Sequence, residues 1–419
     1  MLSQSTNLYK NLQRRYSLRI NLDLKRIKKV LKFLNFPHLK VKNPINIIGS
    51  DGKMSTLSSL KYFLEAENKK VNTFTSPHLY DFRQRFWLKN RFITIKEIKK
   101  CIKIIEKTDI KLTLFELLTC IYILSAKKNN NVDYNLIESG LLFKKDSTNL
   151  WHSPRAQIIT NINFQHQDWV KPKTIFEICR QKLSSLSQKT TIYVGKQNPK
   201  TLKIIKYFLK KNKSKIIFPS SWKIIKKRNK YIYKDKKNTI LIKSKNIYSE
   251  GLINNLGLAI KVALDFGVDK KKIIKVIPKI KFEGRVQYVQ KGKLKALLNK
   301  NEKLLIDGCH SIESAKNLNN HLKMTKDPIY GIFGMQKNKL PNKFISCFKN
   351  RFKKIITIKI PNESNSLSKD ELKEITEKYT KVSTANNLTS ALKILSSKEK
   401  KTIVIFGSLY LVGNFLSKN

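Results

Sequence analysis

A short strand that runs into a glycine turn and then into a helix constrains the fold of this chain more than any other sequence feature. Residues Ile45–Thr56 read Ile-Asn-Ile-Ile-Gly-Ser-Asp-Gly-Lys-Met-Ser-Thr. The apolar run predicts a buried strand, and the apolar residues spaced through 57–64 predict a helix. Backbone N–H groups at such a turn favour a phosphate, and the lysine neutralises its charge. The stretch therefore predicts a phosphate-binding loop, with an ordinary strand-to-helix turn as the alternative.

The spacing of this loop differs from the standard Gly-x-x-x-x-Gly-Lys-Ser/Thr pattern. Only two residues separate Gly49 from Gly52, and Met54 stands between Lys53 and the two hydroxyls that can reach a magnesium ion, Ser55 and Thr56. The loop by itself leaves nucleotide binding and the plain turn both open, so the rest of the chain has to decide between them.

The composition is that of a globular chain with room for two domains. The sequence has 419 residues, of which 41% are hydrophobic, and no apolar run is long enough to span a bilayer. Its five cysteines have no paired spacing, which argues against a zinc ribbon or a disulfide framework and for a reducing compartment.

The formal net charge of +57 is spread over the whole chain. Lysines occupy nearly every expected loop, accompanied by many Asn and Ile residues, and they do not gather in one tail or on one helix face. We attribute the charge to a compositional bias and expect only salt-sensitive, nonspecific association with polyanions. A dedicated nucleic-acid or membrane surface is therefore not predicted.

The first 20 residues carry three arginines and no acid, which is typical of a transit peptide. They lack a clear amphipathic period and lead directly into a stretch that predicts a first helix, Asn21–Ile27. We therefore treat them as part of the fold.

Strand-like and helix-like stretches alternate along the chain, which predicts parallel α/β sheets. In the first half, strands are predicted at 71–78 (ending in a loop), 132–138, 156–161, 191–194 and 239–242, and an apolar helix at 112–126. Gly49, Ser76, Glu138 and His166 all follow predicted strands, and the carboxyl ends of parallel strands share one edge of a sheet. We expect these four residues to lie at the same edge.

The second half restarts the pattern, so the chain is predicted to form two α/β units joined near Phe282–Arg285. The predicted strands are 304–307, 329–334, 354–358 and 402–406, and the predicted helices are 313–322, 370–379 and 388–396.

Eight short motifs follow one another in a fixed order: Gly49–Ser55, Thr75–Leu79, Phe115-Glu116, Glu138–Asn149, Ile159–His166, Gly284-Arg285, Asp307–Ser311 and Gly407–Leu411. Over nearly its whole length the chain resembles the folylpolyglutamate synthase/dihydrofolate synthase family, within the Mur-type ATP-dependent amide ligases. The family versions of five of these motifs are Gly-Thr-Asn-Gly-Lys-Gly-Ser, Thr-Ser-Pro-His-Leu, Glu-Val-Gly-Leu-Gly-Gly-Arg-Leu-Asp-Ala-Thr-Asn, Ile-Thr-x-Ile-x-x-Asp-His and Asp-Gly-Ala-His-Asn.

The resemblance implies an α/β protein with two domains. Residues 1–285 would form a P-loop-type ATP-binding domain with a mostly parallel sheet, and residues 286–419 a smaller, Rossmann-like C-terminal domain. The implied reaction is ATP- and Mg²⁺-dependent ligation of L-glutamate to dihydropteroate, and also to folates, through an acyl phosphate. The alternatives are a Mur-type amide ligase with another acceptor, or a catalytically weakened, basic relative that binds polyanions.

The resemblance also assigns roles to individual residues. Lys53, Lys182 and His166 would be catalytic, with Lys182 carbamylated. Mg²⁺, with K⁺ as an optional further ion, would be held by Ser76, Glu138 and His166. ATP would contact Gly49, Ser50, Gly52, Lys53, Met54, Ser55, Thr56, Asn255, Arg285, Asp307 and His310. The pterin substrate would contact Asp23, Leu24, Phe115, Glu116, Lys145, Asp146 and Ser147. The structural alternatives are a buried, satisfied acid for Glu116 and an ordinary hydrogen-bonded residue for either histidine.

Several positions depart from the family pattern. Met54 replaces a glycine, Leu142 and Phe143 replace two glycines, Lys144 replaces an arginine, Gln165 replaces an aspartate, and Ser311 replaces an asparagine. Drift, a changed substrate and weakened activity are all open explanations. We expect small-molecule partners only, no specific nucleic acid or membrane partner, a monomer and a cytoplasmic location.

Overall fold

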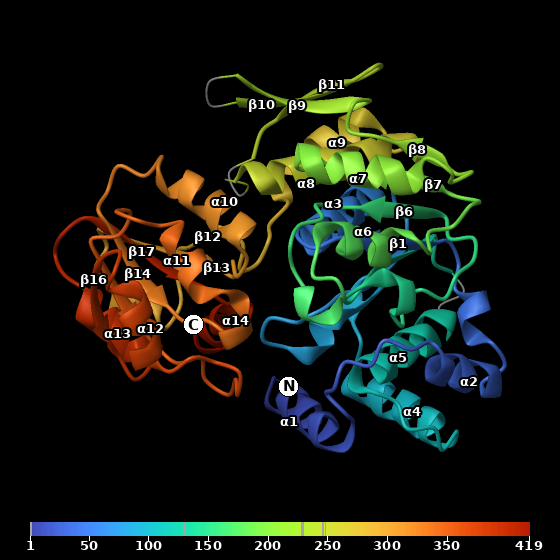
Figure 1. Cartoon of the computed structure of the whole chain (residues 1–419), viewed down its shortest axis with the longest axis horizontal. Coiled ribbons are helices and arrows are strands. Elements are labelled where there is room, and N and C mark those ends of the chain that lie inside the picture. Colours follow the sequence, from blue (N-terminus) through green and yellow to red (C-terminus); the bar gives the residue numbers. More distant parts are fainter. Residues whose placement is uncertain (1, 129–130, 228–229, 245–246, 248) are drawn as a thin grey trace. The chain divides into compact units, whose positions relative to one another are not determined.

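The computed structural model of the protein describes residues 2–128, 131–227, 230–244, 247 and 249–419 (Figure 1). The chain divides into two compact units, of which the first comprises Met1–Ser244 with Leu252–Ile280 and the second Lys245–Gly251 with Lys281–Asn419. Each unit is built of helices and a mostly parallel sheet, so the predicted fold class is confirmed. The domain limits of 1–285 and 286–419 stay a prediction.

The first unit is organised around an eight-stranded sheet. Its strands, in spatial order, are β4 (Arg91–Phe92), β3 (Phe86–Leu88), β2 (Val71–Phe74), β5 (Tyr134–Glu138), β1 (Pro44–Ile48), β6 (Ala156–Ile159), β7 (Thr191–Val194) and β8 (Lys215–Ile217). The six strands from β2 to β8 pair in parallel, and β3 and β4 add an antiparallel edge. All five residues of β1 are buried, as expected for a central strand covered on both faces.

One predicted strand does not belong to this sheet. Thr239–Ile242 forms β11, which pairs antiparallel in a separate three-stranded sheet with β10 (Lys230–Asp235) and β9 (Trp222–Lys227). The prediction of a parallel strand at this position is therefore wrong. Strands β8, β9 and β10 were not predicted. Strand β8 has only three residues, and in β9 and β10 lysines interrupt the apolar residues, so that neither an apolar run nor a clean alternation marks them.

Nine helices lie in the described part of the first unit or begin at its border: α1 (Leu2–Arg15), α2 (Lys25–Phe33), α3 (Lys53–Ala66), α4 (Ile95–Glu106), α5 (Leu114–Lys128), α6 (Ile175–Leu183), α7 (Pro199–Leu209), α8 (Glu250–Asp265) and α9 (Lys270–Val276). The helix predicted from Asn21 begins only at Lys25 and is preceded by α1. This first helix packs as part of the fold, because Leu12 is fully buried and Ser5 Oγ donates to Asp81 Oδ1 at 2.6 Å.

Two clusters of buried side chains hold helices on the sheet. One joins α2, α4 and α5 to Phe74 of β2 and Ile137 of β5. The other joins α6 and α7 to Ile48 of β1 and Ile159 of β6. Strands β1, β2, β5 and β6 are neighbours at the centre of the sheet. The packing of these helices against them therefore fixes the positions of their carboxyl ends.

The second unit has a six-stranded sheet in the order β12 (Gln287–Val289), β13 (Glu302–Asp307), β17 (Lys401–Phe406), β14 (Ile329–Phe333), β15 (Lys354–Thr357) and β16 (Lys381–Thr384). Only β12 is antiparallel to its neighbour. The helices are α10 (Ile312–Leu322), α11 (Pro341–Ser346), α12 (Lys369–Thr376), α13 (Leu388–Leu395) and α14 (Leu409–Lys418). All four predicted strands are present, and the edge strands β12 and β16 were missed. Across both units, no helix among the described residues has the length and apolar character needed to cross a bilayer.

Candidate nucleotide and metal site

The sheet brings the phosphate loop and two of the predicted metal ligands to one edge. Gly49 follows β1, Ser76 follows β2 and Glu138 ends β5, and the sheet order places β1 and β2 on either side of β5. The backbone N–H of Ser76 donates to Glu138 Oε2 at 3.0 Å. The sheet confirms that these three residues lie at its carboxyl edge. Their roles stay predictions.

The two glycines of the phosphate loop stand where there is no room for a side chain. Gly52 has a φ of +86°, and a Cβ at this position would lie 2.6 Å from the Asn255 side chain. A Cβ at Gly49 would overlap the Thr160 hydroxyl. Helix α3 begins directly after Gly52, and Lys53 Nζ donates to the carbonyl oxygens of Gly49 and Ser50 at 3.2 Å each. Glycines have no side chain, so the backbone N–H groups of this loop can approach a phosphate group closely.

The residues that follow the lysine face different surroundings. Met54, which replaces a family glycine, is 46% exposed, so its side chain is directed to solvent and not into the core. Ser55 is buried, and its Oγ donates to the Gly52 carbonyl at 3.1 Å and accepts from Asn255 Nδ2 at 2.8 Å. Thr56 Oγ1 is buried with no hydrogen-bond partner among the described residues. Asn255, a residue of α8, is thereby tied to a loop 200 positions earlier in the chain.

Gly52→Ala is expected to destabilise the protein by about 2–4 kcal/mol, since it combines a strained left-handed backbone with the clash against Asn255. The matched control is Gly267→Ala, where φ is +83° and a Cβ would meet nothing within 4 Å, so only the backbone strain of about 1 kcal/mol remains. Urea unfolding of both variants measures the difference. Equal shifts in the two variants would show that Asn255 does not pack against the loop.

Lys182 reaches the same loop from α6. Its side chain is fully buried, and Nζ donates to the carbonyl oxygens of Gly49 at 2.9 Å and Leu141 at 3.0 Å. Burial, followed by the nearby charge of Lys53, lowers the pKa of Lys182 to about 7. The ammonium and neutral amine forms are therefore both populated near neutral pH.

His166 lies on the loop after β6 and is the third predicted metal ligand. It has a φ of +63° and immediately precedes the short helix Gln167–Trp169. In the parts of the chain described here, no group of three or more His, Cys, Asp or Glu side chains is placed to hold a metal ion. The predicted set contains a hydroxyl, a carboxylate and an imidazole. Its oxygen ligands, Ser76 and Glu138, are the kind that Mg²⁺ prefers.

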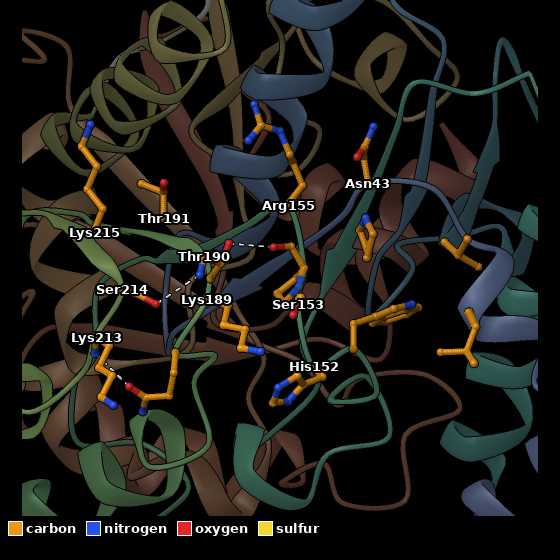
Figure 2. A pocket seen from close by; sticks show the side chains of 16 residues that line it. Asn43, His152, Ser153, Arg155, Lys189, Thr190, Thr191, Lys213, Ser214 and Lys215 are labelled. Atoms are coloured by element: carbon orange, nitrogen blue, oxygen red, sulfur yellow. Dashed lines mark hydrogen bonds between the residues drawn. The ribbon is translucent and has the colours of Figure 1, made fainter.

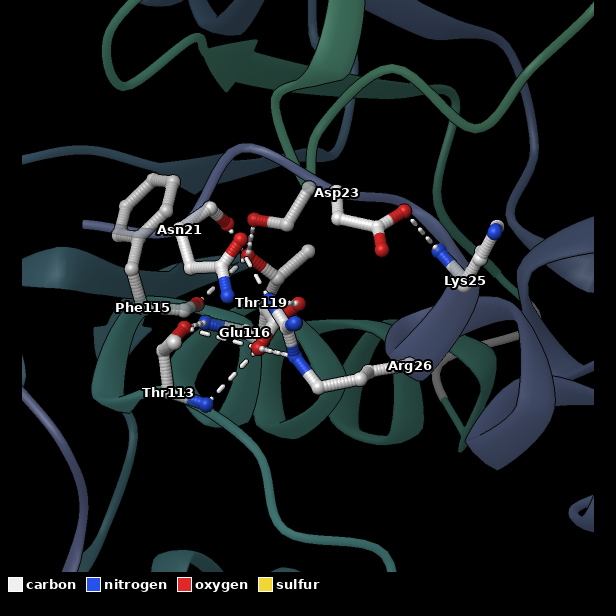
Figure 3. A network of polar contacts seen from close by, with 9 residues as sticks. Asn21, Asp23, Lys25, Arg26, Thr113, Phe115, Glu116 and Thr119 are labelled. Atoms are coloured by element: carbon white, nitrogen blue, oxygen red, sulfur yellow. Dashed lines mark hydrogen bonds and ion pairs between the residues drawn. The ribbon is translucent and has the colours of Figure 1, made fainter. Parts of the chain in front are cut away.

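On the predicted pterin side, Glu116 is a paired acid (Figure 3). Arg26 Nε donates to Glu116 Oε2 at 3.1 Å, and Arg26 Nη2 to Oε1 at 3.0 Å. The backbone N–H of Thr113 also donates to Oε2, at 2.8 Å, at the start of α5. The geometry of Glu116 is therefore that of the structural alternative, a buried acid whose oxygens accept hydrogen bonds. Arg26 was missed, although it stands three residues after the singled-out Asp23.

The other predicted pterin-side residues lie around the same end of α5. A Cβ at Gly140 would lie 2.7 Å from the Phe115 ring and 2.9 Å from Asp146 Oδ2, so these two side chains flank the glycine. The hydroxyls of Ser147 and Thr119 are 2.7 Å apart. Three predicted residues are more exposed: Lys145 is exposed, and Asp23 and Leu24 are partly exposed. Figure 3 shows Asp23 next to Lys25, whose backbone N–H donates to the Asp23 carboxylate at 2.9 Å, while Phe115 lies on the other side of Asn21.

Two of the departures from the family pattern have a structural explanation. Leu142 and Phe143 are buried in the same cluster as Ile178 and Cys179 of α6, so their bulk fills the core under the helix that carries Lys182. Ser311 is the N-cap of α10, and its Oγ accepts from the Ser314 N–H at 3.1 Å. Serine and asparagine are both good N-caps, which explains the exchange.

The predicted residues of the second unit form a compact turn of their own. Asp307 accepts from the N–H groups of Val286 and Cys309, at 2.7 Å each, and complete burial raises the pKa of its carboxyl group. Arg285 Nη1 donates to the Gly308 carbonyl at 3.1 Å, and His310 Nδ1 is 3.0 Å from the same oxygen. These contacts hold the Asp-Gly-Cys-His turn, and its predicted contact with nucleotide stays a prediction.

A hollow of about 800 Å³ lies at the opposite, amino-terminal edge of the eight-stranded sheet (Figure 2). It is lined where β1, β6, β7 and β8 begin, by residues that include Arg155, Lys189, Lys213 and Lys215. These four are the Lys and Arg residues among its 16 lining residues, a share close to the 86 in 419 of the whole chain. Its positive charge is therefore what the composition alone provides, and it does not mark an anion site.

Comparison with known proteins agrees with the fold. Residues 290–418 match the family described as dihydrofolate synthetase, C-terminal domain. The dihydrofolate synthase/folylpolyglutamate synthase of Bacillus subtilis is 23% identical over 418 residues, covering 93% of each chain. The structure of E. coli FolC in complex with DHPP and ADP has a TM-score of 0.85 at 19% identity, covering 98% of this chain and 96% of that one. A bifunctional folylpolyglutamate synthase/dihydrofolate synthase with Mn, AMPPNP and L-glutamate bound has a TM-score of 0.82 at 20% identity, covering 99% and 97%.

The chain shares its fold, a parallel sheet with a phosphate loop followed by a smaller α/β unit, with the solved folylpolyglutamate synthases. It is similar over nearly its whole length to dihydrofolate synthase/folylpolyglutamate synthases, and its residues 290–418 match the dihydrofolate synthetase C-terminal domain.

Proposed function

We propose that this chain is an ATP- and Mg²⁺-dependent ligase that joins L-glutamate to dihydropteroate, and also to folates. The observation that carries the proposal is the convergence of Lys53, Lys182 and Asn255 on one glycine loop beside Glu138. The Lys53 ammonium group at a loop that a phosphate fits suits the transfer of a phosphoryl group. The relatives named above act on, or are complexed with, substrates of this kind.

In the proposed reaction a substrate carboxylate attacks the γ-phosphate of ATP to give an acyl phosphate, and the amine of L-glutamate then displaces phosphate. Lys53 would exchange its two carbonyl contacts for phosphate oxygens and neutralise their charge. Asn255 would contact the base, and Arg285, Asp307 and His310 would contribute from the second unit. Phosphoryl transfer depends mainly on such positioning and charge neutralisation.

The residues at the sheet edge fit a magnesium ion by their chemistry. The Ser76 hydroxyl and the Glu138 carboxylate supply oxygen ligands at adjacent strand ends, and His166 would hold a second ion. Bound Mg²⁺ neutralises phosphate charge and orients the transferring group.

Lys182 is proposed to react with CO₂. The neutral amine nitrogen bonds to the carbon of CO₂ and a proton leaves to solvent, which gives a carbamate whose oxygens would supply further oxygen ligands for an ion. A buried amine with a pKa near 7 has the neutral form that this addition needs.

On the acceptor side, Phe115 and the Glu116–Arg26 pair would contact the pterin, with Asp146, Ser147 and the Asp23–Leu24 segment beside them. The proposed partners are small molecules, namely dihydropteroate or a folate, L-glutamate and ATP. We further propose a monomer in the cytoplasm, with no specific nucleic-acid or membrane partner.

The test is phosphate release from ATP with Mg²⁺ and L-glutamate, with dihydropteroate or tetrahydrofolate in parallel reactions. We expect release that needs both the acceptor and glutamate, and a product heavier by one glutamyl residue. Excess EDTA should abolish release, and added Mg²⁺ should restore it, because the phosphate charge is then neutralised again.

Two results would contradict the assignment. Release without either pterin, but with another carboxylic acid, would indicate a Mur-type ligase with a different acceptor. No release from folded protein, together with nucleic-acid binding that persists at physiological salt, would favour the non-enzymatic alternative, since purely electrostatic binding weakens steeply as salt rises.

A further inference from the structure

Several hydrogen bonds join the phosphate loop to the loop that carries His166, among them those between Ser50 Oγ and the Asn163 backbone, and two of them meet at the Asp51 carboxylate. Asp51 Oδ2 accepts from Gln165 Nε2 at 3.0 Å and from Asn163 Nδ2 at 2.7 Å. The backbone continues the contact, because Asp51 and Asn161 form an antiparallel bridge. Gln165 immediately precedes His166, and Asp51 stands two residues before Lys53.

Both side chains of this contact depart from the family motifs, and they do so reciprocally. The family loop Gly-Thr-Asn-Gly-Lys has an amide where this chain has Asp51. The family segment Ile-Thr-x-Ile-x-x-Asp-His has a carboxylate where this chain has Gln165. The two positions are 114 residues apart in sequence, yet they meet in a single hydrogen bond. The pair thus consists of one acid and one amide in both cases. In the family the acid stands before the histidine, and in this chain it stands in the phosphate loop.

The exchange has a physical reason. A carboxylate only accepts hydrogen bonds at neutral pH, whereas an amide donates through its NH₂ group. If only position 165 had kept the family acid, Asp51 would face a second carboxylate with no proton between them. With one acid and one amide, either arrangement makes the same charge-assisted hydrogen bond.

We propose that Asp51 and Gln165 are positioning residues that form a charge-exchanged clasp, which fixes His166 relative to the phosphate loop and which a second carboxylate in the pair would break. The proposal rests on the proposed function in that His166 and Lys53 serve the same metal–nucleotide site. Gln165 in place of the family aspartate is then a compensated change and not a sign of lost activity.

A double-mutant cycle tests the clasp with Asp51→Asn, Gln165→Glu and the double variant. The readout is the Kd of Mn²⁺·ADP, followed by electron paramagnetic resonance of Mn²⁺, alongside thermal unfolding. Gln165→Glu is expected to weaken binding about 10-fold or more, because two carboxylates face each other. Asp51→Asn is expected to weaken it only about 2–3-fold, because an amide oxygen can still accept both hydrogen bonds. The double variant should return to within about 3-fold of the wild type.

The control is Gln167→Glu, which adds the same charge to the same loop two residues further on and should change Kd by less than about 2-fold. Additive losses, or tighter Mn²⁺ binding by Gln165→Glu, would overturn the clasp. If Gln165→Glu fails to fold while the double variant folds, that rescue itself shows the coupling.

The readouts also separate this inference from the ligase assignment. A non-additive cycle in a protein that releases no phosphate with any pterin would retain the clasp and refute the ligase. An additive cycle in a protein that makes glutamylated product would do the reverse.

Discussion

Replacing Lys53 by alanine is expected to lower acceptor-dependent phosphate release by about 10²–10³-fold. Lys53 is the first residue of α3, and its Nζ lies against the carbonyl oxygens of Gly49 and Ser50 at the mouth of the loop. The ammonium group is thus positioned where phosphate charge would develop, and alanine leaves that charge uncompensated. Single-turnover phosphate release with saturating ATP measures the effect on the chemical step.

The matched control is Lys69→Ala, which removes the same charge from an exposed side chain just beyond the end of α3. This variant should keep at least about half of the wild-type rate, since exposed charges at such a distance are screened by salt. Both variants should unfold within about 1 kcal/mol of the wild type, because the contacts of Lys53 are ordinary hydrogen bonds. A Lys53→Ala enzyme with an unchanged rate would remove the phosphate loop from the mechanism.

Replacing Lys182 by methionine is expected to lower the rate by about 100-fold or more while leaving the fold intact. The lysine is completely buried, and burial lowers its pKa from 10.5 to about 7. Between about pH 7 and 10.5 the unfolded chain binds a proton that the folded chain does not, so the free energy of unfolding rises with pH across this window. Methionine cannot titrate, so the variant should lose this part of the slope.

Urea unfolding at pH 7 and pH 9 in CO₂-depleted buffer measures the slope, and ¹³C NMR with ¹³C-bicarbonate reports the carbamate directly. Lys189→Met is the control, since its side chain is exposed and it should change neither readout. A carbamate signal that persists in Lys182→Met would assign the modification to another residue. An unchanged pH slope would show that Lys182 is not buried as a neutral amine.

The parts of the fold that could be predicted from the sequence are those with dense local signals. Strand β1 is an apolar run interrupted only by Asn46 and followed by two glycines. The strands ending near Ser76 and Glu138 are similarly buried, so apolar residues and turn residues mark all three. The parallel order then follows from the alternation of strands and helices, and it places the strand ends together. For this reason the residues at the carboxyl edge of the sheet could be predicted from the sequence.

What could not be predicted depends on long-range partners. The role of Arg26 depends on its contact with Glu116, which is 90 residues away in the sequence, and the role of Asp51 depends on its contact with Gln165. Strands β9 and β10 are stabilised by pairing with each other, and their lysines hide the alternation that would have marked them. Lys182 could be aligned by resemblance among 86 lysines and arginines, but no sequence pattern shows that its side chain is fully buried.

The carbonyl oxygen of Gly49 accepts hydrogen bonds from Lys53 and Lys182 alike. A carbonyl oxygen has two lone pairs, so one atom serves as a shared node between the start of α3 and the interior of α6. If Lys182 is carbamylated as proposed, its nitrogen keeps one N–H to divide between the carbonyl oxygens of Gly49 and Leu141, so Lys53 would meet less competition for the Gly49 oxygen. Dissolved CO₂ would then act as an input to the proposed nucleotide site.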